Sequence, residues 1–221
     1  MQTVMMPLTD NEFLVGKILC IGRNYVDHIH ELGNEIPTAP VVFSKPATSI
    51  IRDGDTVIIP AYSSVCHYEA ELAVLIGQDV KNCSVEEALS MVAGYGVAID
   101  MTLRDVQDQL KGKGLPWDIA KGFDTACPLS AFVPAGQVSD PQNLRITLQV
   151  NSQYRQDGST ACMMHTVAQI ISYLSSVFTL EEGDIILTGT PAGVGQVVDG
   201  DVMIAAIEGI GQVNVAVRQG V

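Results

Sequence analysis

The sequence predicts a mostly β, mixed α+β fold in one domain of 221 residues. Short apolar runs rich in Val and Ile recur along the chain between clusters of Gly, Pro, Asp and Asn, which is the pattern of strands separated by turns. One segment, residues 167–178, has apolar residues at helical spacing and predicts an amphipathic helix. Strand and helix patterns do not alternate regularly, which argues against a doubly wound parallel sheet. A few short helices on a mixed β-sheet are therefore expected.

The N-terminal third predicts three strands around one short polar helix. Gly33 and Asn34 end that helix, and two prolines bound the loop after it. We expect strands at 17–21, 41–44 and 56–59 and a helix at 26–32.

A central acidic strand, residues 67–77, is the most informative element. Side chains alternate along a strand, so His67, Glu69 and Glu71 share one face. The following run, 73–76, is continuously apolar and draws the acidic end inward. The spacing of Ser84 and Glu87 is that of a capping box, so a helix is expected at 85–93.

A second acidic position follows at the end of the next predicted strand, 94–99, which delivers Asp100. Thr102 with Asp105 predicts a helix start directly after it. A buried, unpaired carboxylate is costly, so Glu69, Glu71 and Asp100 together indicate a divalent cation site. Oxygen ligands suit Mg²⁺, Mn²⁺ or Ca²⁺ better than zinc. An ordinary acidic face on an edge strand is the alternative.

The C-terminal half predicts a turn-rich loop followed by a meander of strands. The loop is 112–128, and loops often carry binding residues. Strands are expected at 144–150 and 154–156, with Asp157-Gly158 nearby, at 184–187, and twice between 202 and 217.

Composition limits the partners. The net charge of −13 argues against nucleic acid, whose phosphates it would repel. Hydrophobic residues make up 47% and charged residues 17%, so we expect apolar surface to be covered in a homodimer. Five dispersed cysteines, with no secretory signal and no apolar run long enough for a membrane span, predict a cytoplasmic protein with reduced thiols.

Six motifs in order give the chain a family resemblance over about residues 17–217. They are Gly22-Arg23-Asn24-Tyr25-x-x-His28, Phe43-Ser44-Lys45-Pro46, His67-x-Glu69-x-Glu71-Leu72, Gly96-x-x-x-Asp100-Met101-Thr102-x-Arg104-Asp105, Pro116-Trp117-x-x-Ala120-Lys121-Gly122-Phe123-Asp124 and Leu187-Thr188-Gly189-Thr190-Pro191. Together they resemble the fumarylacetoacetate hydrolase superfamily, and most closely its small single-domain acylpyruvase and oxaloacetate decarboxylase group.

The resemblance implies a rolled mixed β-sheet, a dimer and a central Mg²⁺. It implies that Glu69, Glu71 and Asp100 ligate the metal. It also implies that His28 and Glu31 form a catalytic pair on a lid, with Lys121 beside the metal. The implied substrate contacts are Arg23, Lys45, Arg104, Gln107 and Thr190.

The function expected from the resemblance is Mg²⁺-dependent hydrolysis of 2,4-diketo acids, such as fumarylpyruvate or acetylpyruvate, with release of pyruvate. His28, held by Glu31, would take a proton from the attacking water. Decarboxylation of oxaloacetate, or isomerisation of 2-hydroxyhepta-2,4-diene-1,7-dioate in aromatic catabolism, is the alternative on the same metal. The pair favours hydrolysis, since decarboxylation needs no activated water. A non-catalytic metal-binding or interaction protein is a third reading. Taken alone, His28 could also be just a solvated helix residue.

Overall fold

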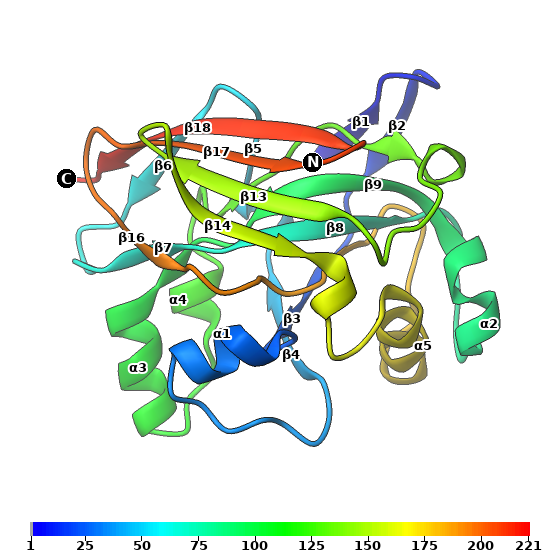
Figure 1. The fold of residues 1–221 in the computed structure, drawn as a ribbon, viewed down its shortest axis with the longest axis horizontal. Coiled ribbons are helices and arrows are strands. Elements are labelled where there is room, and N and C mark those ends of the chain that lie inside the picture. The colour runs from blue at the N-terminus through cyan, green and yellow to red at the C-terminus, as the bar shows by residue number, and fades with distance from the viewer. Residues whose placement is uncertain (1) are drawn as a thin grey trace.

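Two β-sheets pack against each other in the computed structural model, which describes residues 2–221 (Figure 1). The larger sheet has six strands in the order β12-β9-β8-β15-β3-β4, and the second has five in the order β14-β13-β17-β18-β6. Parallel and antiparallel neighbours occur in both, because β15 runs parallel to β3 and β18 parallel to β6. The mostly β, mixed fold predicted from the sequence is confirmed.

The six-stranded sheet holds the central acidic segment. Its strands are β3 (Ile18–Gly22), β4 (Val41–Lys45), β8 (Ala70–Ile76), β9 (Val92–Ile99), β12 (Val133–Pro134) and β15 (Ile185–Leu187). The five-stranded sheet consists of β6 (Thr56–Ile59), β13 (Arg145–Val150), β14 (Gln153–Ser159), β17 (Val202–Ile207) and β18 (Gly211–Gln219).

Smaller elements complete the described chain. Short pairings join β1 (Thr3–Met6) to β2 (Asn11–Leu14), β5 (Ile50–Ile51) to β11 (Cys127–Pro128), and β7 (Cys66–Tyr68) to both β10 (Thr102–Leu103) and β16 (Gly195–Val197). The α-helices are α1 (Val26–Glu31), α2 (Val85–Ala88), α3 (Arg104–Gly112), α4 (Asp118–Lys121) and α5 (Val167–Val177). Four 3₁₀ turns cover Ala47–Ser49, Leu89–Met91, Ala135–Gln137 and Thr160–Cys162.

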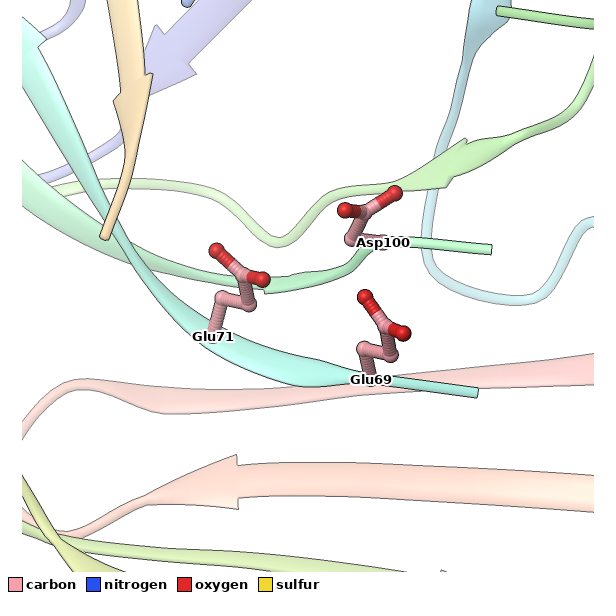
Figure 2. Close-up of side chains that lie close together, drawn as sticks. All are labelled: Glu69, Glu71 and Asp100. Carbon is pink, nitrogen blue, oxygen red and sulfur yellow. The ribbon is translucent and has the colours of Figure 1, made fainter. Parts of the chain in front are cut away.

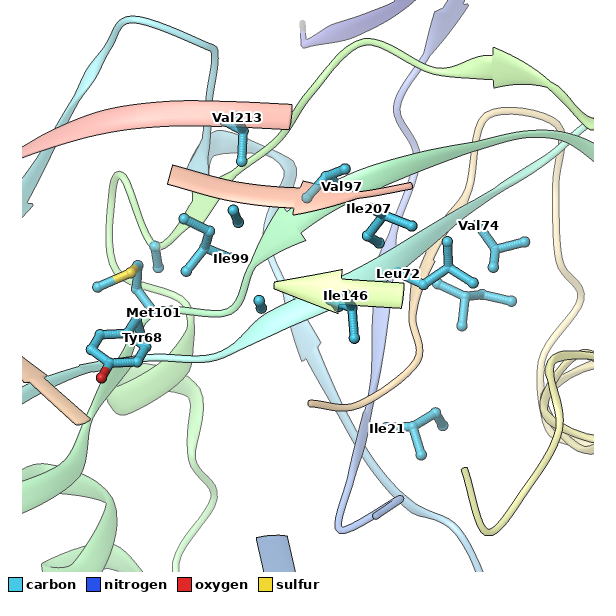
Figure 3. Packing of buried hydrophobic residues seen from close by; sticks show 14 of the residues in the cluster. Ile21, Tyr68, Leu72, Val74, Val97, Ile99, Met101, Ile146, Ile207 and Val213 are labelled. Atoms are coloured by element: carbon cyan, nitrogen blue, oxygen red, sulfur yellow. The ribbon is translucent and has the colours of Figure 1, made fainter. Parts of the chain in front are cut away.

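Apolar side chains cover both faces of the six-stranded sheet. One face meets the five-stranded sheet, where Leu72 and Ile99 belong to the same cluster as Ile146 and Val213 (Figure 3). The opposite face carries a second cluster that includes Ala73, Leu75 and Ala98. Burial on both faces explains why β8 reads as a continuous apolar run and not as an alternating one.

The helix predicted at 85–93 is too long. The capping box of Ser84 and Glu87 is present, but α2 ends at Ala88 and a 3₁₀ turn follows to Met91. Val92 already pairs with Ile76 in the sheet, so tertiary hydrogen bonding overrides the helical pattern.

The predicted helix start at Thr102 is also wrong. Thr102 pairs with His67 as part of β10, and α3 begins at Arg104 without any side-chain cap. Asp105 lies in the first turn as expected, but its carboxylate accepts hydrogen bonds from Ser63 Oγ at 2.6 Å and the Ser64 amide at 2.9 Å.

The turn between β13 and β14 lies at Asn151 and Ser152, whose φ angles of +50° and +64° are left-handed. This is the geometry of a tight two-residue hairpin turn. Asp157 and Gly158, by contrast, pair within the sheet. In residues 2–221 no helix is both long and apolar enough to cross a membrane.

Candidate metal centre and active site

Three buried carboxylates converge where β8 and β9 meet α3. Glu71 pairs with Ala98 across the two strands, and Ala70 with Ile99, so that Asp100 follows at the level of Glu69. Glu69 and Glu71 continue the face of Ala73 because side chains alternate. Figure 2 shows the three carboxylates turned toward one another. One oxygen of each lies within 4.8 Å of the others.

Two lysines and one arginine neutralise part of this charge. Lys121 Nζ donates to Glu69 Oε2 at 2.8 Å, to Asp100 Oδ2 at 2.7 Å and to Thr102 Oγ1 at 2.6 Å. Arg104 pairs with the other oxygen of Glu69. The amine of Lys45 lies 2.7 Å from Asp100 Oδ1 and donates to the backbone carbonyl of Lys121.

These contacts shift the pKa values of Glu69 and Glu71 in opposite directions. Burial would raise the pKa of Glu69, but Lys121 and Arg104 outweigh it and hold that pKa well below its usual value. Burial raises the pKa of Glu71 well above its usual value, and the neighbouring Asp100 and Glu69 add to the effect. Glu71 is therefore the carboxylate of the cluster that most needs another cation.

The donor set fits a hard divalent ion. Asp100 Oδ1 is buried and forms an ion pair with Lys45 at 2.7 Å, but it accepts no hydrogen bond among residues 2–221. The hydrogen bond that Glu71 receives comes from the Gly189 amide, at 2.7 Å. Three converging carboxylates are typical of Mg²⁺ or Mn²⁺ coordination that leaves positions for substrate. Glu69, Glu71 and Asp100 could thus hold the metal.

Helix α1 lies over the cluster and brings the predicted pair together. His28 Nδ1 is 3.3 Å from Glu31 Oε2, one helical turn away. The Glu31 carboxylate also accepts a hydrogen bond from the Gly193 amide, at 3.0 and 3.2 Å to its two oxygens. His28 is buried and lines the same cavity as the three carboxylates. Because Glu31 engages Nδ1, Nε2 is the nitrogen left for chemistry.

The other predicted site residues divide into two groups. Arg23, Arg104, Gln107, Thr190 and the catalytic candidate Lys121 line the cavity. Lys45 does not line it: its side chain is buried beneath Asp100, where it also donates to the Met101 carbonyl at 3.2 Å. The structure therefore places Lys45 as a support for the carboxylate cluster.

Several residues that line the cavity were not predicted as site residues from the sequence. Lys111, Trp117, Phe43, Leu32 and Asn34 also line it. A signal for Lys111 was available, because it follows Arg104 and Gln107 at helical spacing and so shares their face of α3.

A further missed residue, Asn24, fixes the segment that leads into α1. Its buried side-chain amide donates to the His165 carbonyl at 3.0 Å and to the Thr188 carbonyl at 2.9 Å, and its oxygen accepts from the His165 amide at 2.8 Å. The next residue along from Thr188 is Gly189, whose amide binds Glu71. Asn24, just before α1, and the carboxylate of Glu71 thus both form hydrogen bonds with the loop that contains Thr188 and Gly189.

Comparison with known proteins gives one consistent result. The family described as fumarylacetoacetate (FAA) hydrolase C-terminal matches residues 17–218. The mitochondrial oxaloacetate tautomerase of Bos taurus is 50% identical over 193 residues, covering 87% of each chain. The oxaloacetate tautomerase of Escherichia coli (strain K12) is 45% identical over 199 residues, covering 90% of this chain and 91% of that protein.

A solved structure shares the fold almost throughout. Fumarylpyruvate hydrolase from Pseudomonas aeruginosa, crystallised in complex with Mn²⁺ and pyruvate, superimposes with a TM-score of 0.95 at 36% identity, covering 99% of this chain and 96% of that chain.

Proposed function

The chain belongs to the fumarylacetoacetate hydrolase family of metal-dependent enzymes, and from this premise we propose that it is a tautomerase of oxaloacetate. Relatives that are 45–50% identical over most of both chains carry that activity in their names. Hydrolysis of acylpyruvates, the function expected first from the sequence, becomes the second candidate. Its support is the His28–Glu31 pair and the 36% identity to a fumarylpyruvate hydrolase.

One observation carries the proposal: a histidine oriented by a carboxylate lines the same cavity as three carboxylates close enough to hold one metal ion. Keto–enol exchange needs a base at C3 of the substrate and positive charge beside its 2-oxo oxygen. Mg²⁺ or Mn²⁺ held by Glu69, Glu71 and Asp100 would supply that charge and anchor the 2-oxo carboxylate.

His28 would move the proton. Its Nε2 takes the proton from C3, the electron pair of that C–H bond becomes the C2–C3 double bond, and the 2-oxo oxygen takes up the negative charge of an enolate. The imidazolium then returns the same proton to that oxygen, so one residue serves both halves and no atom is gained or lost. Glu31 stabilises the positive charge that His28 carries between the two steps.

The cations of the cavity would hold the substrate. Burial lowers the pKa of Lys121, but Asp100 and Glu69 raise it by more, so the amine stays charged and its positive charge favours an anionic substrate in the cavity. Arg104 and Gln107 are already joined by a hydrogen bond of 2.7 Å, which orients both toward the cavity. These donors offset the anionic substrate in a chain whose net charge is −13.

For hydrolysis the same histidine would act on water instead. Nε2 would take a proton from a water that attacks the distal carbonyl of an acylpyruvate, and the C–C bond would break to leave a carboxylic acid and pyruvate. Both reactions use one site, so only a substrate comparison separates them.

The experiment follows both reactions in one preparation of the protein. Loss of the enol absorbance of oxaloacetate, with the keto form captured by malate dehydrogenase, reports tautomerisation. Pyruvate release from fumarylpyruvate, acetylpyruvate and oxaloacetate reports hydrolysis and decarboxylation. Each assay is run with Mn²⁺, with Mg²⁺ and with EDTA, on the natural chain, on Glu71→Ala and on a matched control, Glu86→Ala, whose side chain is exposed on α2.

Metal-dependent enol–keto exchange that is lost in Glu71→Ala and kept in Glu86→Ala is the expected result. Pyruvate release from fumarylpyruvate without acceleration of the exchange would overturn the order of the two candidates. Exchange that is unaffected by EDTA would refute the metal assignment.

Two further properties belong to the same proposal. We place the protein in the cytoplasm as a homodimer, with its cysteines reduced. All five cysteines are unpaired in the structure, and four are buried. The hairpin of β1 and β2 leaves Leu8 and Leu14 exposed at its tip and end, an apolar surface suited to a second copy. Sedimentation of the natural chain and of Leu14→Asp tests the dimer.

A further inference from the structure

We propose that Lys111 and Arg23 form a second anion subsite, which holds the distal carboxylate of a dicarboxylate substrate at the end of the cavity away from the metal ligands. The inference rests on the function proposed above, since it concerns the same cavity. It adds a binding role for Lys111, a residue outside every motif of the sequence. It also means that Lys111 and Arg23 select substrates by their length and charge.

Lys111 reaches the cavity from the last turn of α3. It shares a helix face with Arg104 and Gln107, and all three line the cavity. Its amine lies 5.5 Å from the centre of the Trp117 ring, a cation–π contact that holds the long side chain over the cavity wall. Arg104 contacts the carboxylate cluster directly, so Lys111, two turns further along, marks the outer end.

Arg23 reaches the cavity from the other side, where β3 leads into α1. Its backbone is left-handed, with φ of +60°, an uncommon conformation for a residue with a side chain. The guanidinium donates to Asn34 Oδ1 at 3.0 Å, a neutral oxygen from the segment after α1. Both Arg23 and Asn34 line the cavity.

Each cation beside Glu69 and Asp100 has a carboxylate partner, whereas the cations at this outer end lack an effective one. Lys45, Lys121 and Arg104 each form an ion pair with Glu69 or Asp100. Within residues 2–221, Arg23 has no carboxylate within 4.0 Å.

Lys111 has a single weak partner, Asp108, at 3.8 Å, and the Asp108 side chain is 64% exposed. An exposed contact of this length contributes little. Two cations without effective partners in one cavity are unusual in a chain with 25 acidic and 12 basic residues.

The environment of Lys111 agrees with this assignment. Partial burial lowers the pKa of its amine, and the positive charges of Arg104, Arg23 and Lys121 lower it further, while the one acidic neighbour, Asp108, opposes them. An arriving carboxylate would relieve that repulsion, so its binding would be favoured by charges already in place.

An apolar wall lies along the cavity beside these cations. The rings of Phe43 and Trp117 lie with their centres 5.8 Å apart and are tilted by 54°, and Leu32 lines the cavity as well. Lys121 lies 4.7 Å from the centre of the Phe43 ring, so this wall begins beside the metal ligands and reaches Lys111 through Trp117. A short carbon chain with a carboxylate at each end matches that sequence of polar, apolar and polar surface.

Unreactive 2-oxo acids test the subsite by binding alone. Isothermal titration of the Mn²⁺-loaded protein compares 2-oxoadipate with 2-oxohexanoate, which has the same number of carbons but no distal carboxylate. 2-Oxoglutarate and 2-oxovalerate give the same comparison one carbon shorter. The variants are Lys111→Met and Arg23→Gln, and the control is Lys113→Met, an exposed lysine two residues further on that does not line the cavity.

The natural chain and Lys113→Met should bind at least one of the two dicarboxylates about 10- to 100-fold more tightly than its matched monocarboxylate, the range expected of a charge-assisted hydrogen bond. Lys111→Met should lose most of this preference while it still binds the monocarboxylate. Arg23→Gln should lose part of it.

An unchanged preference in Lys111→Met would overturn the subsite. An equal loss of affinity for both acids of a pair would also overturn it, because it would mean that Lys111 supports the cavity without recognising the distal group. Since no turnover is measured, this result is independent of the proposed reaction. A chain with the preference but no activity contradicts the proposed function, and an active chain without the preference contradicts the subsite.

Discussion

Replacing Glu71 with glutamine should make the metal-free protein more stable and, at the same time, unable to bind its metal. Glu71 is buried beside Glu69 and Asp100, whose own charges are matched by lysine and arginine side chains. Glutamine keeps the shape of the side chain, and its Oε1 can still accept the hydrogen bond from the Gly189 amide. The substitution therefore removes mainly a repelled negative charge.

The magnitude follows from the geometry. Two unit charges at the 4.8 Å limit that joins the ligand oxygens interact by about 3 kcal/mol at an effective dielectric constant of about 20. Lys121 attracts Glu71 and cancels part of this repulsion. A gain of about 1–3 kcal/mol in the free energy of unfolding is expected, which corresponds to about 2–12 °C in Tm for a chain of this size.

The gain should depend on pH in a defined direction. The pKa of Glu71 is raised in the folded chain, so below that pKa the carboxyl is protonated and the repulsion is absent. Between the ordinary pKa of a glutamate in the unfolded chain and this raised pKa, the folded chain retains a proton that the unfolded chain has lost, so the natural metal-free chain loses stability relative to the variant as the pH rises through that interval. The difference between the two proteins should therefore be small at pH 5 and larger at pH 8.

Urea unfolding in EDTA, followed by circular dichroism at both pH values, measures the effect, with Glu86→Gln as the exposed control. Addition of Mn²⁺ should then stabilise the natural chain and leave Glu71→Gln unchanged. A metal-free variant that is less stable than the natural chain at pH 8 would refute the reasoning, since it would mean that the Glu71 charge stabilises the fold.

Three other substitutions test separate parts of the site. His28→Ala should lower turnover about 10²- to 10⁴-fold with little change in Mn²⁺ affinity, and equal losses of both, measured by kinetics and calorimetry, would make His28 a structural residue. Gly193→Ala should cost about 1–3 kcal/mol and weaken activity, because φ is +100° and a Cβ would lie 2.1 Å from the Arg155 carbonyl oxygen; thermal unfolding that matches the natural chain would contradict this. Asn24→Ala should lower the free energy of unfolding by about 2–4 kcal/mol, because the backbone carbonyls of His165 and Thr188 lose their hydrogen-bond donor. A smaller loss in chemical denaturation would mean that water replaces the amide.

Much of the carboxylate cluster could be predicted because strand geometry is periodic. Glu69 and Glu71 share a face by alternation, and the apolar run after them indicated burial that the structure bears out. Asp100 could be placed at the end of a strand, but its position beside Glu69 depends on the register between β8 and β9, which one sequence does not specify.

The ends of helices and strands were less predictable where pairing within a sheet determines them. Residues 89–93 fit a helical pattern as well as a strand, and the hydrogen bonds of Val92 to its neighbour strand settle the outcome. Thr102 resembles a helix cap, but it pairs with His67 and therefore belongs to strand β10. The hairpin of β1 and β2 was missed because its strands are only four residues each and pair mainly with each other.

The role of Lys111 could not be predicted from the sequence for a different reason. Its position on α3 could be read from helical spacing, but the value of its charge depends on which carboxylates surround it in space. Ion pairing is decided by contacts between distant segments, such as Arg104 with Glu69, and these leave Lys111 without a strong partner. The role of such a residue appears only once the neighbours are known.

The pairing of Glu71 with Ala98 also makes metal uptake a test of correct folding. A slip of β8 by one residue would turn its carboxylates to the opposite face of the sheet, toward the apolar cluster of Leu72 and Ile99, and leave Asp100 alone. A chain trapped in that register could not acquire the ion. The metal proposed for this site would therefore bind only chains whose central strands are correctly aligned, and its binding would favour the native register over its nearest competitor.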